Sequence, residues 1–377
     1  MKKQNEKKKL LVITNHSYML WRFRKDLLRK LQEEYEVVIS TPFVGHEEDF
    51  KALGFRMIET GFERRKVNPL SELKLLIEYW QMIRREAPDL VITYSIKPNI
   101  FAGLVCRLCK VPYVVNVQGL GAVFQKKSVA AVATVLYRIA LREAKVVFFE
   151  NTENARIFGE KRIVQASQVQ VLPGAGIDLE RFMCKDYPEN EKVQFLYLGR
   201  IMRDKGMDEL FEAVRRLHGA YPGRFVLGMV GFFEDEYKEQ VEVLEMQGIV
   251  KFFGFQREPR EFLEHADCIV LPSYHEGLSN VLLEAAATGR PIITSDIPGC
   301  RETVIPGKSG LLCSVKDVES LYNRMESFLK LSRAERCAMG QAGRALVQKR
   351  FEKGMVVDMT VDAIKSRVFG AASQNGV

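Results

Sequence analysis

The sequence predicts an α/β protein built from two doubly wound domains. Two series of short aliphatic runs alternate with longer helical patterns, and a polar segment at 179–192 separates the two series. Continuous Val/Ile runs bounded by turn residues are typical of parallel strands covered by helices on both faces. The 377 residues also exceed one ordinary core and suit two. We therefore expect a first domain at 1–175, a second at 176–350, and a C-terminal helix and tail at 351–377 that packs on either one.

The expected strands divide between the two domains. The first series comprises the runs at 10–14, 36–40, 89–94, 113–117 and 145–149. The second comprises 194–200, 224–231, 268–273 and 291–296. Ligands of open α/β sheets bind at the carboxyl ends of the strands, so we expect both domains to face a central cleft that holds the active site.

The composition indicates a folded, non-membrane-spanning chain. With 47% hydrophobic and 28% charged residues, the sequence lacks the depletion of apolar residues that marks disorder. No run reaches the roughly 18 to 20 apolar residues that a spanning helix needs, and the basic start flows into a strand-like run rather than a cleavage site. Seven scattered cysteines fit a reducing cytoplasm. The lone pair Cys106 and Cys109 is read as one face of a helix rather than as a metal or redox site.

The positive charge is concentrated in the first half. Residues 1–175 hold 29 Lys and Arg against 18 Asp and Glu, whereas the remainder holds 27 against 30. Such asymmetry indicates a nucleic acid, an anionic membrane surface or a phosphate-bearing substrate as a partner of the first domain. The alternative is a set of solvated helix faces, as in the run 22–30. The basic residues considered are Lys2, Lys3, Lys7, Lys8, Lys9, Arg22, Arg24, Lys25, Arg64, Arg65, Lys66 and Lys97.

The stretch HEGLSNVLLEAAATGR carries two glutamates, Glu276 and Glu284, eight positions apart. It follows the expected strand 268–273, so its loop lies at a strand's carboxyl end. We expect a helix to begin near Asn280 with Ser279 as its N-cap. The free N–H groups and the dipole of a helix start bind phosphate without a dedicated cation.

Two carboxylates that flank an anion-binding helix start suit a ligand with phosphate in the middle and hydroxyls at each end. A nucleotide sugar has this composition. The alternative, that both glutamates are ordinary surface residues, is weakened by the small residues Ala285, Ala286, Ala287 and Gly289. These predict close packing around the helix, where an unpaired carboxylate is costly.

A second motif, LGRIMRDKGMDEL, places two cations after the first strand of the second series. Arg200 and Lys205 would then lie at a strand's carboxyl end. Fixed cations there can neutralise a diphosphate as it departs. Taken alone, this motif is also a common surface pattern.

Together these motifs resemble the retaining nucleotide-sugar glycosyltransferases of family 4, which have the GT-B fold of two Rossmann-like domains and an E-x7-E motif. The similarity extends through VLPGAGIDLERF at 171–182. In the first half, SIKPNIFAG at 95–103 and NVQGLGAVF at 116–124 resemble bacterial members that build capsule, O-antigen or N-glycan precursors on polyprenyl diphosphate.

The resemblance implies a role for each motif residue. Glu284 would bind the nucleotide ribose, Glu276 the donor sugar, and Arg200 and Lys205 the diphosphate. The remaining donor-binding residues would be Gly277, Leu278, Ser279 and Asn280. The acceptor-binding residues would be Lys97, Asn99, Gln118 and Gly119. For Lys97 an exposed loop lysine remains the alternative.

The resemblance also implies the reaction and its partners. A sugar, expected to be an N-acetylhexosamine, would move from a UDP-sugar to a polyprenyl-diphosphate-linked saccharide with retention of configuration. No aspartate pair follows a strand, and EDE at 234–236 is read as a solvated helix start, so we expect cations rather than a metal to stabilise the leaving group. The UDP-sugar is a co-substrate and no cofactor is expected. We place the enzyme in the cytoplasm, peripheral at the inner face of the cell membrane, with no nucleic-acid partner.

The sequence departs from the family pattern in the first domain. Many members have a glycine-rich turn after the first strand, where this chain has NHSYMLWRF at 15–23. Many also have a histidine near the position of Gln118, so no catalytic histidine is assigned, although His16 and His275 fall near the expected cleft.

Other functions fit less well. A dinucleotide-dependent dehydrogenase would need a G-x-G-x-x-G turn, which follows none of the strands, and a P-loop around GKS at 307–309 would need glycine where Glu302 stands. A basic nucleic-acid-binding protein would explain the charge but not the two glutamates. A nucleotide-sugar epimerase of the same two-domain fold is the nearest enzymatic alternative.

Overall fold

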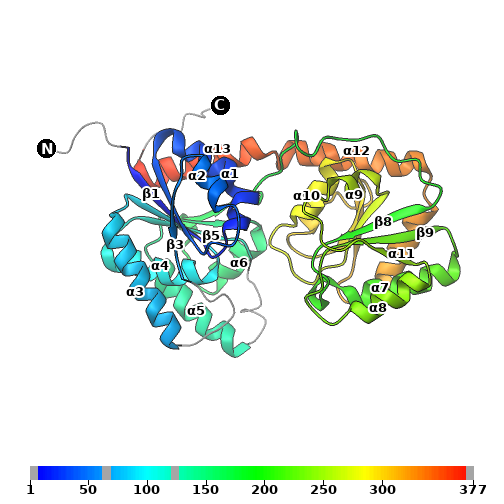
Figure 1. Ribbon diagram of the computed structural model, residues 1–377, viewed down its shortest axis with the longest axis horizontal. Helices are drawn as coiled ribbons and strands as arrows, with labels where there is room; N and C mark the ends of the chain where they lie inside the picture. The colour runs from blue at the N-terminus through cyan, green and yellow to red at the C-terminus, as the bar shows by residue number, and fades with distance from the viewer. Residues whose placement is uncertain (1–6, 62–68, 120–126, 371–377) are drawn as a thin grey trace. The chain divides into compact units, whose positions relative to one another are not determined.

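The computed structural model describes residues 7–61, 69–119 and 127–370, and the chain divides into two compact units (Figure 1). The first unit comprises 1–176 together with 354–377, and the second comprises 177–353. The division falls one residue beyond the boundary that the sequence predicts. The last helix, α13 (Lys353–Phe369), packs on the first unit, an assignment that the sequence left undecided.

The first unit contains a seven-stranded parallel sheet with the order β3-β2-β1-β4-β5-β6-β7. Its strands are β1 (Lys9–Ile13), β2 (Glu36–Thr41), β3 (Arg56–Glu59), β4 (Leu90–Tyr94), β5 (Tyr113–Val117), β6 (Val146–Phe149) and β7 (Val169–Val171).

Helices cover both faces of this sheet, as continuous aliphatic strands require. Along β1, Leu10 and Val12 face one layer of helices, whereas Leu11 and Ile13 face the other. The first layer consists of α1 (Ser17–Glu34), α2 (Glu47–Ala52) and α13. The second consists of α3 (Pro69–Glu86), α4 (Ile96–Cys109), α5 (Lys127–Leu141) and α6 (Thr152–Glu160).

The second unit contains a six-stranded parallel sheet with the order β10-β9-β8-β11-β12-β13. Its strands are β8 (Val193–Leu198), β9 (Phe225–Val230), β10 (Val250–Phe252), β11 (Cys268–Leu271), β12 (Ile292–Ser295) and β13 (Gly310–Cys313). Its helices are α7 (Met207–Ala220), α8 (Lys238–Met246), α9 (Arg260–His265), α10 (Asn280–Ala287), α11 (Val318–Lys330) and α12 (Arg333–Arg350). Short 3-10 turns are η2 (Ala166–Gln168) in the first unit and η3 (Arg203–Lys205) and η4 (Arg301–Thr303) in the second.

All nine predicted strands are confirmed, and the four that the sequence did not predict share one property. β3, β7, β10 and β13 are the edge strands of the two sheets. They have three or four residues each and are only partly buried. An edge strand is covered less completely, so its sequence lacks the long aliphatic run that marks a central strand.

Strand order reverses once in each sheet. In the first sheet the reversal lies between β1 and β4, and in the second between β8 and β11. The connections diverge at such a point, which leaves a crevice at the carboxyl ends of the two strands where ligands of this fold class bind. Each unit therefore has one position at which a site is expected.

None of the helices in the described part of the chain is long and apolar enough to cross a membrane. Within the same residues, no group of three or more His, Cys, Asp or Glu side chains is arranged to hold a metal ion. Cys106 and Cys109 both lie on α4, and Cys106 is packed in the core of the first unit. Burial raises the pKa of the Cys106 thiol, which agrees with its interpretation as part of a helix face.

Candidate active site

Two loops meet at the switch point of the second sheet. The chain leaves β8 through Arg200 and the turn η3, and it leaves β11 through the loop 272–279. The backbone N–H of Tyr274 donates a hydrogen bond to the Asp204 carbonyl at 2.8 Å. This bond fixes the η3 turn against the loop and brings the predicted residues Lys205 and Glu276 together.

Lys205 and Glu276 form an ion pair with Nζ 2.5 Å from Oε1, and their side chains are 16% and 14% exposed. The fully buried Ser273 donates its hydroxyl to the same carboxylate oxygen at 2.8 Å. A pair that is so largely removed from water interacts more strongly than a surface pair. The arrangement holds a carboxylate and an ammonium group side by side at the carboxyl edge of the sheet.

Gly206 makes this close approach of the two loops possible. Its φ is +75°, and a Cβ there would lie 2.1 Å from the carbonyl oxygen of Pro272. Any side chain would therefore push the η3 turn away from the loop after β11. In the sequence R-D-K-G, Lys205 directly precedes this glycine, which is the only residue type that fits the contact.

A third loop, after β12, supports Glu276 from the other side. Gly299 has φ +86°, and a Cβ there would lie 2.2 Å from the Gly277 carbonyl oxygen. The backbone N–H of Ser279 donates to the Gly299 carbonyl at 2.9 Å. The Gly299 N–H in turn donates to Glu302 Oε2 at 2.6 Å. The backbone around Glu276 is therefore held by two neighbouring loops.

The helix α10 begins at Asn280, as the sequence predicts. Ser279 occupies the N-cap position, although its side chain makes no capping hydrogen bond. Leu278 and Ser279 are buried, and donor contact by them stays a prediction. Gly277 and Asn280 are partly exposed.

Glu284 lies in the second turn of α10 and is only 3% exposed. The following residues Ala285, Ala286 and Ala287 are fully buried, which confirms the packing that the sequence predicts. Glu284 is therefore not an ordinary surface glutamate. A buried carboxylate is costly unless hydrogen-bond donors meet it, and ligand hydroxyls are suitable donors.

Arg200 is held by the EDE segment at 234–236, which does not lie at a helix start. Arg200 Nη1 lies 2.6 Å from Glu234 Oε2, and Asp235 Oδ2 accepts a hydrogen bond from the Arg203 N–H at 2.8 Å. These acidic residues lie in the loop between β9 and α8, and α8 begins only at Lys238. The predicted helix start is therefore wrong, whereas the predicted solvent exposure is confirmed for Asp235 and Glu236. The segment also supports the cationic turn through Glu234 and Asp235.

Sequence reasoning missed a second buried carboxylate beneath the site. The Tyr274 hydroxyl hydrogen-bonds to Glu209 at 2.9 and 2.7 Å from its two oxygens, and Glu209 is 9% exposed. Burial, and then the bond to Glu209, raises the pKa of the Tyr274 hydroxyl, so Tyr274 stays a donor. Glu209 sits in the amphipathic helix α7, where nothing in the pattern distinguishes it from a surface residue.

The charge of Glu276 also acts on its buried neighbours. Burial raises the pKa of Tyr197 and of Cys300, and the negative charge of Glu276 adds to both effects. Tyr197 donates its hydroxyl to the Arg200 carbonyl at 2.5 Å. Both groups therefore stay protonated beside Glu276.

The switch point of the first sheet also bears polar residues. Ser95, directly after β4, donates its hydroxyl to Asn15 Oδ1 at 2.6 Å, and Asn15 follows β1. Ser95 has φ +75°, a conformation that non-glycine residues adopt rarely and that is enriched at functional sites. This backbone conformation of Ser95 could not be predicted, because serine does not encode a positive φ.

Lys97 lies in the first turn of α4 near this switch point. It is 19% exposed and its Nζ lies 2.8 Å from Glu72 Oε1 on α3. The alternative interpretation as an exposed loop lysine is therefore wrong. An acceptor role for Lys97 stays a prediction.

The direct acceptor contact predicted for Asn99 does not fit the structure. Asn99 is 1% exposed, accepts a hydrogen bond from the Thr93 hydroxyl at 2.8 Å and donates to the Asn116 carbonyl at 2.9 Å. Its amide joins α4 to β4 and β5, so it positions the loops rather than meeting a ligand. Gln118 and Gly119, which follow β5, are partly exposed, and acceptor contact by them stays a prediction.

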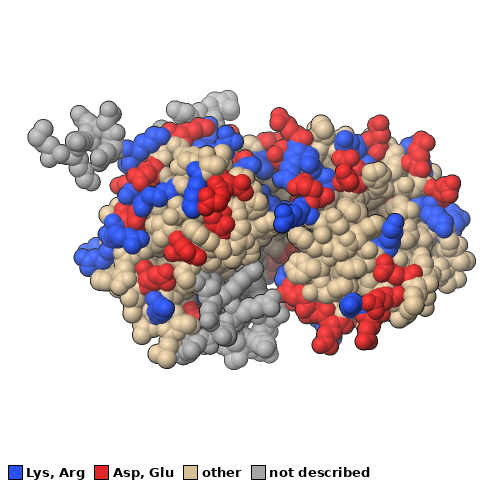
Figure 2. Space-filling model, viewed as in Figure 1, with Lys and Arg blue, Asp and Glu red and all other residues tan. Residues whose placement is uncertain are grey.

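The basic excess of the first half is distributed unevenly. Arg24 is buried and pairs with Glu150 at 2.7 Å, so it cannot belong to a basic surface. The residues Lys2, Lys3, Arg64, Arg65 and Lys66 lie outside the described residues. On the face that Figure 2 shows, basic and acidic side chains are interspersed over the first unit. A membrane contact therefore needs a more specific surface than net charge alone.

Two doubly wound units, with a cation–carboxylate pair and an adjacent helix start at the second switch point, define a glycosyltransferase of the GT-B fold. Residues 182–346 match the family "glycosyl transferases group 1", and residues 9–151 match "glycosyl transferase 4-like". The chain belongs to these glycosyltransferases.

Relatives and solved structures agree with this assignment. The chain is 27% identical over 331 residues to the N,N'-diacetylbacillosaminyl-diphospho-undecaprenol alpha-1,3-N-acetylgalactosaminyltransferase of Campylobacter jejuni, covering 82% of this chain and 86% of the relative. It is 27% identical to the UDP-Gal:alpha-D-GlcNAc-diphosphoundecaprenol alpha-1,3-galactosyltransferase of Escherichia coli, covering 69% and 71%. Anabaena HepE in complex with UDP-glucose has a TM-score of 0.76 at 17% identity, covering 95% of this chain and 99% of that one.

Proposed function

We propose that this enzyme transfers an N-acetylhexosamine, with retention of configuration, from a UDP-sugar to a polyprenyl-diphosphate-linked saccharide in the assembly of cell-surface glycans. The observation that carries the proposal is the Lys205–Glu276 pair at the second switch point, beside the start of α10 and its buried Glu284. This arrangement supplies a cation for a diphosphate, a carboxylate for a sugar and a second carboxylate for a ribose.

Lys205 and Arg200 are suited to the leaving diphosphate. A lysine ammonium group has three donors, of which one is directed at Glu276, so further donors are left for phosphate oxygens. Arg200 is about half exposed and is held by Glu234, which orients its guanidinium at the edge of the sheet. Charge that develops on the departing UDP would be stabilised by these fixed cations.

Glu276 and Glu284 divide the ends of the donor between them. Glu276 is partly exposed and anchored by Ser273 and Lys205, so its second oxygen can accept from sugar hydroxyls. Glu284 is buried in α10, where its carboxylate would accept hydrogen bonds from ribose hydroxyls. Between the two glutamates, the backbone at the start of α10, beside the partly exposed Gly277 and Asn280, would meet the phosphates.

The same residues support a reaction that needs neither a metal ion nor a cofactor. Two cations at the diphosphate position do the work that a divalent ion does in other sugar transferases. The UDP-sugar is consumed as a co-substrate.

The acceptor side of the proposal rests on the relatives and on the first unit. The relatives from Campylobacter jejuni and Escherichia coli are named for acceptors on diphospho-undecaprenol. In this chain, Lys97 and the partly exposed Gln118 and Gly119 lie at the carboxyl edge of the first sheet. We place the enzyme in the cytoplasm, bound peripherally to the inner face of the membrane that carries the acceptor.

Incubation with UDP-N-acetylgalactosamine or UDP-N-acetylglucosamine, with and without a short-chain polyprenyl diphosphate disaccharide, tests the proposal. UDP release and a glycosylated lipid should appear only when both substrates are present, and nuclear magnetic resonance should show a retained anomeric configuration. Conversion of the sugar nucleotide without any acceptor would instead identify an epimerase. Binding to random DNA without turnover of any sugar nucleotide would overturn the assignment of the substrate.

A further inference from the structure

The helix α3 exposes a stripe of large apolar side chains. Leu70, Leu73, Ile77 and Trp80 recur at spacings of three and four, which places them on one side of the helix. Leu70 is 76% exposed, and the other three are between 42% and 55% exposed. The opposite side of α3 is already packed in the core through Leu75, Tyr79, Met82 and Ile83. The packing of α3 in the core therefore does not require the exposed apolar stripe.

The helix α5 exposes a second stripe of the same kind. Val132, Val135 and Ile139 recur at helical spacing and are 61%, 50% and 43% exposed. Between the two stripes lies α4, which contacts both α3 and α5 and exposes Leu108. Figure 1 shows these three helices in one layer of the first unit. The apolar residues thus belong to a single face, which we name the α3–α5 face.

This face runs from one edge of the sheet to the other. The helices run opposite to the strands, so their first turns lie at the carboxyl edge and their last turns at the amino edge. Leu70 and Val132 therefore lie toward the edge that bears Lys97 and Gln118. Ile139 lies toward the amino edge.

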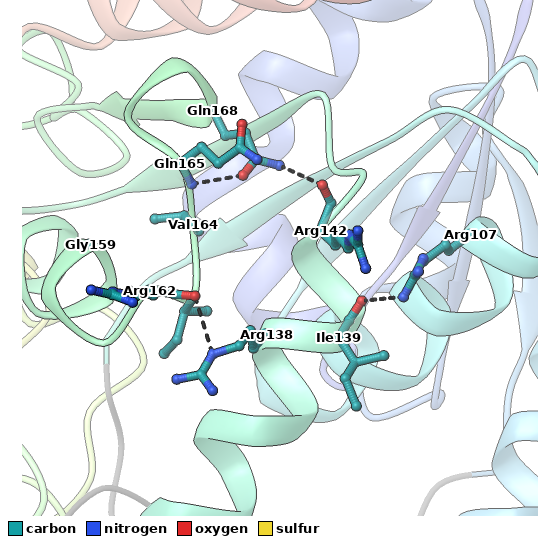
Figure 3. Close-up of a pocket in the computed structure, with 10 residues that line it drawn as sticks. Arg107, Arg138, Ile139, Arg142, Gly159, Arg162, Val164, Gln165 and Gln168 are labelled. Atoms are coloured by element: carbon teal, nitrogen blue, oxygen red, sulfur yellow. Dashed lines mark hydrogen bonds between the residues drawn. The ribbon is translucent and has the colours of Figure 1, made fainter.

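A pocket of about 520 Å³ lined by four arginines lies at the amino end of this face. Arg138 and Ile139 come from the last turn of α5, and Arg142 directly follows that helix (Figure 3). Arg107 comes from α4, and Arg162 from the segment after α6. Ile139 belongs both to the pocket and to the α5 stripe, so the pocket and the apolar surface are continuous.

The pocket has cationic groups that the protein itself leaves available. Arg107 pairs with Glu143 at 2.9 Å, and Arg138 donates to the carbonyls of Arg162 and Lys161. Within the described residues, the guanidinium groups of Arg142 and Arg162 make no hydrogen bond or ion pair. Their charge remains open to an anion, because guanidinium donors match phosphate oxygens well.

Cationic residues also accompany the apolar stripe of α3. The exposed polar positions that interleave with it are Lys74, Gln81, Arg84 and Arg85. Arg84 stacks over the Trp80 ring at 5.0 Å. Of the three acidic residues of α3, Glu72 and Glu78 are partly exposed and Glu86 is buried. Glu72 is paired with Lys97, and Glu86 with Arg85. An anionic partner would therefore meet cationic side chains along α3 as well as in the pocket.

We propose that the α3–α5 face docks on an anionic lipid bilayer, with its apolar side chains in the interface and the arginine pocket around lipid phosphate groups. Apolar side chains with a tryptophan and a cationic margin have the chemistry of membrane-surface helices. The inference deepens the proposed function, because a polyprenyl-linked acceptor resides in such a bilayer. Docking would bring the carboxyl edge that bears Lys97 to the membrane surface.

Sedimentation with vesicles tests the proposal, using phosphatidylcholine alone or with phosphatidylglycerol added. The wild type should sediment only with the anionic vesicles, and high salt should release it. Leu73→Gln with Ile77→Gln should abolish most of the binding, whereas Val243→Gln with Met246→Gln, on exposed apolar positions of α8, should not. Arg138→Gln with Arg142→Gln should weaken binding by roughly thirtyfold, the scale of two basic side chains at an anionic surface.

The control for charge is Arg215→Gln with Arg216→Gln, which removes the same charge from α7 of the second unit and should change binding little. Equal losses of vesicle binding in both arginine variants would overturn the role of the pocket. The same role would be overturned if inorganic phosphate at millimolar concentration did not reduce vesicle binding. A concentration-dependent dimer that the Leu73→Gln, Ile77→Gln variant abolishes would show that a second copy covers the face.

Turnover with a water-soluble acceptor analogue separates this inference from the proposed function. The face variants should keep wild-type turnover there and lose it only with acceptor embedded in anionic vesicles. Failure of the wild type to bind anionic vesicles, with turnover intact, would overturn docking and leave the proposed function in place. Vesicle binding without turnover of any UDP-sugar would overturn the proposed function and leave docking in place.

Discussion

Glu276 Oε1 accepts hydrogen bonds from both Lys205 Nζ, at 2.5 Å, and Ser273 Oγ, at 2.8 Å. Lys205 follows β8 and Glu276 follows β11, so the pair bridges the two strands between which the order of the sheet reverses. Removing one partner of such a pair leaves a largely buried charge without its counter-ion. The pair is therefore expected to matter both for the donor and for the loops that hold it.

Lys205→Ala should lower turnover by about a hundredfold or more, the scale for losing one fixed group that stabilises transition-state charge. Initial rates of UDP release at saturating donor measure this effect. Lys238→Ala is the control, since Lys238 is an exposed lysine of the same unit at the start of α8. Turnover of Lys205→Ala within a few-fold of that control would remove Lys205 from the mechanism.

Gly206→Ala should destabilise the protein by more than the backbone strain of an alanine at this position. A left-handed non-glycine residue costs about 1 to 2 kcal/mol, and the new Cβ would also meet the Pro272 carbonyl oxygen at 2.1 Å. Gly223→Ala is a matched control, because its φ of +71° resembles the +75° of Gly206 and nothing lies within 4 Å of the added carbon. The midpoint of thermal unfolding and the turnover should both fall further in Gly206→Ala than in Gly223→Ala. Equal decreases in the two variants would show that the protein relieves the contact with Pro272 without a loss of stability.

Activity should persist after thorough dialysis against EDTA. The reason is that Arg200 and Lys205 provide the positive charge at the expected diphosphate position. Donor turnover is measured before dialysis, after it, and again after Mg²⁺ or Mn²⁺ is added. Loss of activity that only a divalent cation restores would contradict the cation-based mechanism.

Glu86 provides a test in acid that concerns stability rather than catalysis. Hydrogen bonds from Arg56 hold the pKa of the buried Glu86 carboxyl below its ordinary value. A depressed folded-state pKa stabilises the protein above the unfolded value of about 4.3, and this contribution is lost as the pH falls through the folded-state pKa. The difference in thermal midpoint between wild type and Glu86→Gln should therefore be large at neutral pH and shrink in acid. A constant difference from neutral pH into acid would show that Glu86 contributes through packing rather than through its charge.

The sequence predicts the central strands because each of them is an aliphatic run buried on both faces. It fails at β3, β7, β10 and β13, since these edge strands are short and partly exposed. The start of α10 at Asn280 was predictable for a different reason, because a loop, a small polar residue and an apolar helical pattern follow one another there. Local sequence patterns thus predict those strands and helix starts that are determined by neighbouring residues in the chain.

The residues of the candidate site that lie in short sequence motifs were predictable. The residues that are far apart in sequence and meet only in the folded protein were not. Glu276, Glu284, Arg200 and Lys205 lie in two recognisable motifs, and the structure brings Lys205 onto Glu276. The supports Glu209 and Glu234 come from other elements, 65 and 34 residues from the partners they hold. Asn99 was misread for the same reason, because its partners Thr93 and Asn116 belong to two separate strands.

The measurement that tests the central claim most directly is the affinity for UDP, by titration calorimetry, together with turnover in Glu284→Gln and Glu276→Gln. If the switch point of the second sheet is the donor site, Glu284→Gln should weaken UDP binding by roughly tenfold to a hundredfold, the scale of a hydrogen bond to a charged group. Glu276→Gln should leave UDP affinity nearly intact and lower turnover. Wild-type UDP affinity and wild-type turnover in both variants would contradict the placement of the donor site, and equal losses of UDP affinity would contradict the division of roles between the two glutamates.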